Sequence, residues 1–173
     1  MALSSEGLDQ SAILADLLGT DPIAAIYSSP RERAWYTARD IAEPHELTVQ
    51  GRDDLDEVDF GEWAGRSFEE LQADERWHEW NDARASARCP GGESMGEAVA
   101  RAMAALQAIA AEHDEETIAA VTHCDIIRGV IAHILGLSLD NILRFDVDPA
   151  SVSRLHLGRW GARVGSVNER LYQ

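Results

Sequence analysis

The sequence is poor in cysteine and has no long hydrophobic run. Cys89 and Cys124 are its only cysteines among 173 residues, which is too few for a disulfide framework, and no Cys-x-x-Cys pair indicates a zinc or redox site. No apolar run approaches the roughly 20 residues that a membrane-spanning helix needs. The amino terminus has neither the basic start nor the apolar stretch of a secretion signal. These absences predict a cytoplasmic protein that uses no metal and no redox cofactor.

Positive charge is also scarce. Asp and Glu number 31 against 15 Lys and Arg, which gives a formal net charge of −16. Such a field disfavours binding to nucleic acid and to anionic membrane surfaces. An acidic protein can still bind phosphate if cationic groups and backbone amides converge locally. We therefore expect one convergent site.

What is present is the composition and the pattern of an α/β protein. Its 45% apolar and 27% charged residues are typical of a globular chain, and its length fits one domain over 1–173. Hydrophobic periodicity predicts helices at 3–18, 30–42, 94–113 and 125–135, strands at 23–27, 47–49 and 117–122, and a hairpin at 153–157 and 162–167. This alternation predicts three αβα layers around a mostly parallel sheet.

Three Ser-x-x-Glu patterns mark helix starts, at Ser29, Ser67 and Ser94. In this capping box the serine and the glutamate satisfy amides that the first helical turn leaves unpaired. The second pattern opens a stretch with two tryptophans that ends at the Cys-Pro-Gly-Gly break at 89–92. We expect the segment 64–91 to be a lid-like insertion.

Three residues suited to phosphate chemistry follow predicted strands or lie between them. Arg33 is in the first turn of a helix after one strand, His123 is at the tip of another, and Glu57 lies in an acidic loop. Taken singly, such an arginine is usually a surface charge, such a histidine is structural, and such a loop is solvated. Parallel strands place their carboxyl ends at one edge, where ligands bind. The coincidence of an arginine, a glutamate and a histidine at that edge makes it a candidate active site.

Five segments, in order along the chain, resemble the histidine phosphatase (phosphoglycerate mutase-like) superfamily. They are Leu3–Gln10, similar to Leu-Thr-x-x-Gly-x-x-Gln, Ser28–Ala38, similar to Ser-Ser-Pro-x-x-Arg-Ala-x-x-Thr-Ala, Leu55–Gly65, similar to Leu-x-Glu-x-x-Phe-Gly-x-Trp-x-Gly, Gly92–Ser94, similar to Gly-Glu-Ser, and Val121–Arg128, similar to the segment of the strand-end histidine. Cys124 stands where glycine is common in the family.

The resemblance implies a role for each candidate. Arg33 would bind phosphoryl oxygens together with the backbone amide of Cys124, His123 would donate another hydrogen bond, and Glu57 would protonate the leaving oxygen. A guanidinium and an imidazolium can neutralise the phosphoryl group in place of a metal ion. The segment 64–91 would cover the pocket and select the group attached to the phosphate. The expected partner is a small phosphorylated substrate or phosphate itself.

One element of the family is not found in the sequence. The family nucleophile is a histidine in Arg-His-Gly at the tip of a first strand, and that tripeptide occurs nowhere in residues 1–173. We therefore expect the sheet to lack its first strand and this chain to be inactive by itself. A truncated start, a natural loss of catalysis that keeps a phosphate site, and a segment supplied by another chain each explain this.

Several functions stay open at this stage. The first is a phosphomonoester phosphatase that acts through a phosphohistidine, and the others are a non-catalytic phosphate-binding or regulatory domain and a mutase. A cysteine phosphatase is disfavoured, because its His-Cys-x5-Arg loop needs five residues where only three separate Cys124 from Arg128. The sequence identifies neither the substrate nor the oligomeric state, although a homodimer is compatible with it.

Overall fold

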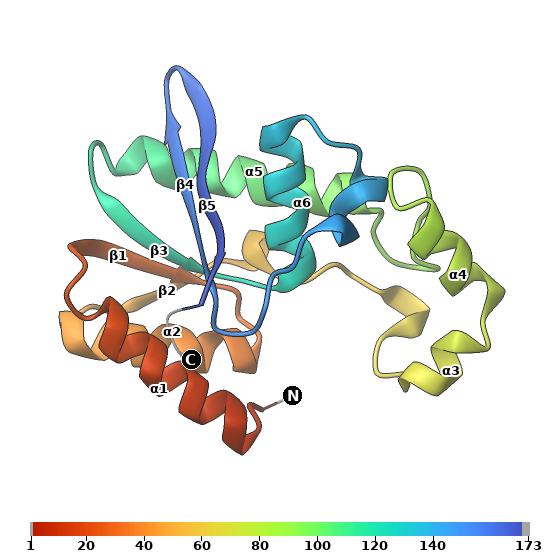
Figure 1. The fold of residues 1–173 in the computed structure, drawn as a ribbon, viewed down its shortest axis with the longest axis horizontal. Helices are drawn as coiled ribbons and strands as arrows, with labels where there is room; N and C mark the ends of the chain where they lie inside the picture. The colour runs from red at the N-terminus through yellow and green to blue at the C-terminus, as the bar shows by residue number, and fades with distance from the viewer. Residues whose placement is uncertain (1, 171–173) are drawn as a thin grey trace.

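The computed structural model describes residues 2–170 and has helices on both sides of a parallel sheet, with a hairpin beside it (Figure 1). The helices are α1 (Ser5–Leu18), α2 (Glu32–Ala42), α3 (Phe68–Gln72), α4 (Glu75–Asp82), α5 (Met95–Glu112) and α6 (Cys124–Leu135). The strands are β1 (Ile23–Ser28), β2 (Val49–Gly51), β3 (Thr117–Val121), β4 (Val152–Gly158) and β5 (Gly161–Glu169). No helix in this range is long and apolar enough to cross a membrane.

The sheet is parallel, and its strands lie in the order β2-β1-β3. Ser28 lies opposite Gly51 of β2 and Val121 of β3, so the three strands end at one edge. One face packs on α1 and α2 through side chains such as Leu14, and the other packs on α5 through side chains such as Ile109. Apolar layers therefore cover both faces, and the predicted three-layer α/β fold is confirmed.

Two of the three predicted capping boxes are confirmed. Ser67 and Ser94 accept hydrogen bonds from amides three residues on, and the glutamates there return a bond to the serine amides. The box predicted at Ser29 is wrong. Helix α2 begins at Glu32, and Arg31 is the residue at its N-cap. The Ser29 hydroxyl instead bonds to the side chains of Asp56 and His123, which come from distant segments.

The short strand β2 is displaced from its predicted position. It occupies Val49–Gly51 rather than 47–49, and Val49 lies opposite Ile26 of β1. Pairing with the longer strand β1 therefore fixes the position of β2, since the sequence pattern of β2 is too short to do so. The hairpin is confirmed as the antiparallel pair β4-β5.

The segment 64–91 holds α3 and α4, which lie at the end of the molecule away from the sheet (Figure 1). An aromatic cluster secures it: Trp77 stacks on Trp80 at 5.5 Å between ring centroids, and Trp63 meets Trp77 edge-on at 5.3 Å. The guanidinium of Arg84 lies 4.0 Å from the centre of the Trp80 ring. The interpretation of this segment as a lid stays a prediction.

Candidate active site

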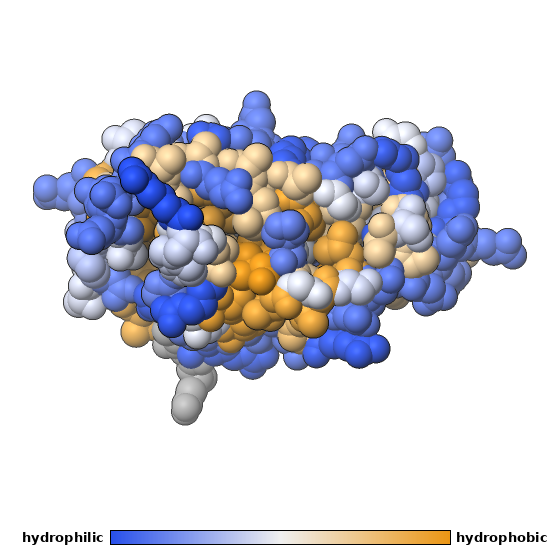
Figure 2. Space-filling view, turned by 90° about the horizontal axis from the view of Figure 1, so that it is seen from above, coloured by the Kyte–Doolittle hydropathy of each residue, from blue (hydrophilic) through white to orange (hydrophobic). Residues whose placement is uncertain are grey.

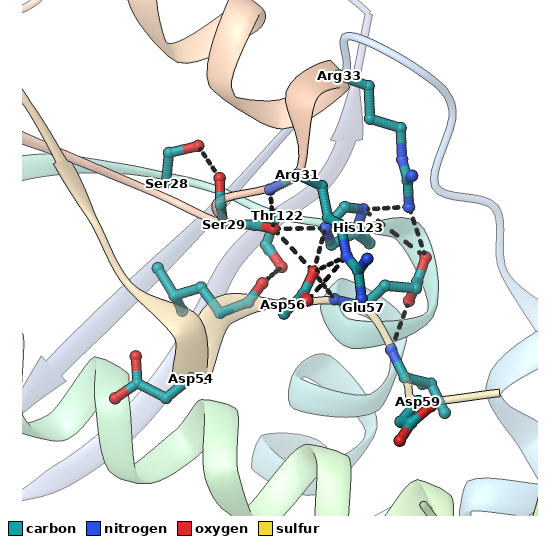
Figure 3. A network of polar contacts seen from close by, with 12 residues as sticks. Ser28, Ser29, Arg31, Arg33, Asp54, Asp56, Glu57, Asp59, Thr122 and His123 are labelled. Carbon is teal, nitrogen blue, oxygen red and sulfur yellow. Dashed lines mark hydrogen bonds and ion pairs between the residues drawn. The ribbon is translucent and has the colours of Figure 1, made fainter. Parts of the chain in front are cut away.

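The edge where β1 and β3 end carries a dense polar network (Figure 3). Ser29 follows β1, and His123 follows β3 and precedes the first turn of α6. Helix α2 begins close to Ser29, which places Arg33 in its first turn. Glu57 comes from the loop after β2. Strands fixed in register by the sheet thus bring side chains far apart in sequence to one place.

The three residues predicted from sequence lie together. Arg33 Nη2 donates to His123 Nδ1 at 2.8 Å and lies 3.7 Å from Glu57 Oε2. His123 Nδ1 is 3.8 Å from the same carboxylate oxygen. The His123 side chain is 3% exposed, whereas Arg33 is 40% exposed. A buried imidazole and a solvent-facing guanidinium therefore flank one carboxyl group.

The second ring nitrogen of His123 fixes its tautomer. Nε2 lies 2.8 Å from Ser29 Oγ, and Ser29 Oγ donates in turn to Asp56 Oδ1 at 3.0 Å. Because that hydroxyl gives its only proton to Asp56, it accepts from His123, so Nε2 carries the hydrogen and Nδ1 has a lone pair for Arg33. Burial, followed by the nearby Arg33 charge, lowers the pKa of His123 to about 4. His123 is therefore neutral at pH 7 in this state.

Asp56 is the last member of a hydrogen-bond relay that runs from His123 through Ser29. Desolvation alone would raise its pKa, but hydrogen bonds from Arg31, from the Glu57 amide and from Ser29 outweigh that effect and lower it. Arg31 Nε donates to Asp56 at 2.9 Å, and the Glu57 amide donates at 2.8 Å. Asp56 is therefore a fixed anion that orients Ser29 and, through it, His123.

The pKa of Glu57 is shifted in the direction opposite to that of Asp56. Its side chain is 17% exposed, and this burial is the main cause that raises its pKa to about 7; the charges of Asp125 and Asp56 add to the shift, while the Val58 amide and Arg33 oppose it. A carboxyl group with such a pKa exchanges its proton near neutral pH, as a general acid must.

An arginine from α5 braces the loop that carries Glu57. Arg101 Nη1 donates to the carbonyls of Asp54 at 3.0 Å and Asp56 at 3.1 Å, and its Nη2 donates to the Glu57 carbonyl at 3.3 Å. The same guanidinium pairs with Glu93 at 2.9 Å. One side chain thus fixes three peptide carbonyls of the loop that carries the carboxyl group.

Cys124 is the first residue of α6, where helix amides have no partner within the helix. This position suits the predicted contribution of its amide to anion binding. Cys124 is exposed as a whole residue. Desolvation of its thiol, followed by the negative charges of Asp125 and Glu57, nevertheless raises the pKa of that thiol. A protonated thiol is a poor nucleophile, which further disfavours cysteine chemistry.

The network also contains four residues that the sequence did not predict, namely Ser29, Arg31, Asp56 and Arg101. Three of them had a local signal, since they lie in the two segments that resemble the phosphatase family. The fourth had none, because Arg101 is one polar residue on a long amphipathic helix. Among residues 2–170, no group of three or more His, Cys, Asp or Glu could hold a metal ion.

An apolar groove of about 920 Å³ leads away from this network. All residues of β3 and most of β4 line it, and its lining also includes Arg33, Glu57, His123 and Cys124. The face turned to the viewer in Figure 2 shows apolar side chains gathered at its centre within a polar surround. The polar site is thus continuous with an apolar channel between the two sheets.

Comparison with known proteins gives a consistent assignment. The profile of the histidine phosphatase superfamily (branch 1) matches residues 1–170. Phosphoserine phosphatase 1 of Hydrogenobacter thermophilus is 32% identical over 157 residues, which cover 90% of this chain and 74% of that protein. The adenosylcobalamin/α-ribazole phosphatase of Escherichia coli is 25% identical over 170 residues, which cover 97% of this chain and 84% of the relative.

Solved structures show the same fold. Bacillus stearothermophilus YhfR superposes with a TM-score of 0.89 at 23% identity, over 95% of this chain and 83% of the other. The mycobacterial glucosyl-3-phosphoglycerate phosphatase, solved in complex with inorganic phosphate, gives a TM-score of 0.85 at 27% identity, over 98% and 88% of the two chains. With its profile, its relatives and its fold in agreement, the chain belongs to the histidine phosphatase superfamily.

Proposed function

We propose that this site is that of a phosphatase for small phosphomonoesters and that the reaction passes through a phosphohistidine. The observation that carries the proposal is the placement of Glu57, a carboxyl group with a pKa of about 7, within 4 Å of both Arg33 and His123. An acid near neutrality beside two potential phosphate-binding side chains meets the requirements of phosphoryl transfer.

The phosphoryl group binds between Arg33 and His123. An incoming dianion accepts from the Arg33 guanidinium, which is already exposed, and takes the place of the contact between Arg33 and His123 Nδ1. His123 then gains a proton on Nδ1 and donates to a phosphoryl oxygen, because a neighbouring anion favours the charged imidazole. The relay through Ser29 to Asp56 keeps the ring in place during this change.

Glu57 handles the proton of the leaving group. When a histidine nitrogen attacks phosphorus, the P–O bond to the alcohol breaks, and the departing alkoxide takes the Glu57 proton. The resulting carboxylate then accepts a proton from the water that attacks the phosphohistidine, which releases phosphate and the free histidine. Glu57 is neutral before the first step and neutral again after the second.

The attacking histidine does not come from Arg-His-Gly within residues 1–173, since that tripeptide is not there. His45 and His78 bond to backbone carbonyls of Leu18 and Gln72, and His113 bonds to Tyr27. We therefore propose that residues 1–173 bind phosphate without turning substrate over. A purely phosphate-binding or regulatory domain is the alternative that this observation favours.

Rescue by free imidazole separates the two functions. If the site is catalytic, imidazole added to residues 1–173 replaces the nucleophile and supports hydrolysis of p-nitrophenyl phosphate and of phosphoserine. Glu57→Gln then slows phosphoserine far more than the nitrophenyl ester, because only the poor leaving group needs a proton. Phosphate binding by calorimetry together with no rescued turnover of either ester contradicts the phosphatase and supports the binding domain.

The segment 64–91 is proposed as the part that selects the substrate. Its aromatic cluster attaches it to the same core as α5 and α6, next to the helix start that carries Cys124. Arg84 of this segment pairs with Asp125 of α6 at 3.1 Å. Phosphoserine is the first ester to test, since relatives of this chain are named phosphoserine phosphatases.

A further inference from the structure

The hairpin β4-β5 carries charge of the sign opposite to that of the whole chain. Glu169 is the one acidic residue between 152 and 169, and Arg154 pairs with it. Arg159, in the turn, and Arg163, on β5, are exposed and make no ion pair or side-chain hydrogen bond with any of residues 2–170. In a protein with a formal net charge of −16, these two guanidinium groups are available to a partner.

Two aromatic rings lie against glycines of the same hairpin. His156 is directly opposite Arg163 in the antiparallel pair. A Cβ atom at Gly165 would stand 3.0 Å from His156 Nε2, and one at Gly158 would stand 2.7 Å from Trp160 Nε1. Trp160 is nevertheless 67% exposed, so much of its ring is open to a partner. Tryptophan and arginine are the residues that most often dominate the binding energy of protein interfaces.

The free edge of β5 indicates what kind of partner fits. Within residues 2–170, β5 pairs with β4 alone, so its other edge carries backbone groups that no strand pairs with. Exposed and half-buried positions alternate from Gly161 to Gly165, so one row of side-chain positions faces solvent. The turn of the hairpin projects past α5 at the border of the molecule (Figure 1). An exposed strand edge of this kind is a template for an extended polypeptide.

The charge of the hairpin selects among extended polypeptides. Carboxylates bind guanidinium groups through paired, charge-assisted hydrogen bonds. A nucleic acid would also offer anions, but its dense phosphates meet repulsion from the acidic remainder of the chain, and it has no use for a strand edge. An acidic segment that contains an aromatic residue therefore matches the arginines, the tryptophan and the edge together.

From the unpaired arginines, the exposed tryptophan and the free edge, we propose that the hairpin β4-β5 docks an extended acidic segment of another protein, which adds as a strand to β5. This surface is distinct from the candidate active site. Arg154 of the hairpin bonds to Asp21, which precedes β1, whereas the active site lies where β1 ends. The docking therefore does not depend on whether the site is catalytic.

Titration with a synthetic peptide tests the docking. The probe is acetyl-Glu-Thr-Glu-Thr-Phe-Thr-Glu-amide, in which strand alternation places the glutamates and the phenylalanine on one face. The control has glutamine in place of each glutamate. We expect the probe to shift the amide NMR signals of residues 161–165 and to bind about tenfold more tightly than the neutral control, because its hydrogen bonds are charge-assisted. Equal affinities, or shifts confined to other residues, overturn the proposal.

Matched protein variants locate the contact. Arg159→Ala combined with Arg163→Ala should weaken the probe about tenfold. Arg39→Ala combined with Arg144→Ala removes the same charge from exposed positions elsewhere and should leave the affinity within about twofold, since distant exposed charges are screened. Both double variants should unfold at the urea concentration of the parent chain. Alanine for the peptide phenylalanine should weaken binding to the parent chain and not to Trp160→Ala. Equal losses in the two double variants overturn the proposal.

Two further measurements separate strand addition from its rivals. Proline in place of the central threonine removes a backbone donor from the peptide and should weaken it about tenfold, so an unchanged affinity contradicts pairing with β5. Oligothymidylate and sedimentation of the chain alone test a nucleic acid and a second copy as occupants. Tighter binding of oligothymidylate than of the probe, or self-association that the hairpin arginine variant abolishes, overturns the proposed partner.

Discussion

The two sides of β3 differ in kind. Toward β1 its backbone is paired, and past its end His123 enters a relay in which each ring nitrogen has a partner. Toward β4 the same strand borders an apolar groove, and its residues Ile118–Val121 are only partly buried. The paired side holds the site rigidly in position, while the open side is where the site is still accessible. Rigidity and access are thus divided between the two edges of one strand.

Removal of the brace on the paired side should have the largest effect. Arg101→Ala leaves three carbonyls and Glu93 without their shared donor, and we expect a loss of about 2–4 kcal/mol in the free energy of unfolding. Urea denaturation measures it. Arg88→Ala is the control, because that arginine pairs with Glu97 at an exposed position, where solvent screens the charges, and its loss should be far smaller.

Removal of the exposed Arg33 guanidinium should have the second largest effect. Arg33→Ala should weaken sulfate or phosphate binding about 10- to 100-fold by calorimetry, the effect of one charge-assisted hydrogen bond pair. The unfolding free energy should change little, since Arg33 lies at the solvent end of the network. Arg39→Ala, one turn and a half along the same helix, should bind like the parent chain. Equal losses from both variants would show a general field effect rather than a site.

The titration of Glu57 should sharpen the comparison further. Its pKa is raised, so it is neutral below about pH 7 and charged above. Sulfate keeps its charge over this range, and its affinity should therefore fall about tenfold as pH rises through about 7, because the carboxylate then repels the anion. Glu57→Gln should remove this step and leave only the dependence due to His123. A step that persists in the variant would assign it to another group.

The relay serine should give the smallest change. Ser29→Ala leaves His123 Nε2 without its acceptor, and we expect nitrogen chemical shifts to report a mixture of tautomers with a loss of about 1 kcal/mol in sulfate binding. Ser28→Ala is a matched control, since that equally buried hydroxyl donates to the Ser29 carbonyl and not to His123. Identical spectra for both variants would show that the ring is held by its packing alone.

The sequence was sufficient for whatever depends on local chemistry. Ser67 and Ser94 cap helices as their patterns predict, and Arg33, Glu57 and His123 converge because each lies next to the carboxyl end of a strand or its loop. The same reasoning failed at Ser29. A serine that is followed by a proline, and three residues later by a glutamate, is compatible with a helix cap and also with a hydroxyl that bonds elsewhere. Only the position of a distant histidine decides where the Ser29 hydroxyl points.

Long-range geometry explains the other differences. The strand β2 is too short to specify its own place and takes it from β1. Arg101 has no local mark because its partners are carbonyls of a loop 44 to 47 residues earlier. The features that the sequence hides are therefore those whose partners lie at a large distance along the chain and that no strand end or motif marks.

That distance also sets the order in which the protein can assemble. Ser29 and His123 are 94 residues apart, and β1 finds β3 only after the intervening chain has collapsed. Helices form within microseconds from neighbouring residues, whereas such distant pairing must overcome loop-closure entropy first. The anion site should consequently be the last part of the molecule to appear during refolding, after most of the helical signal has returned. If the proposed function holds, phosphate binding should therefore return late in refolding.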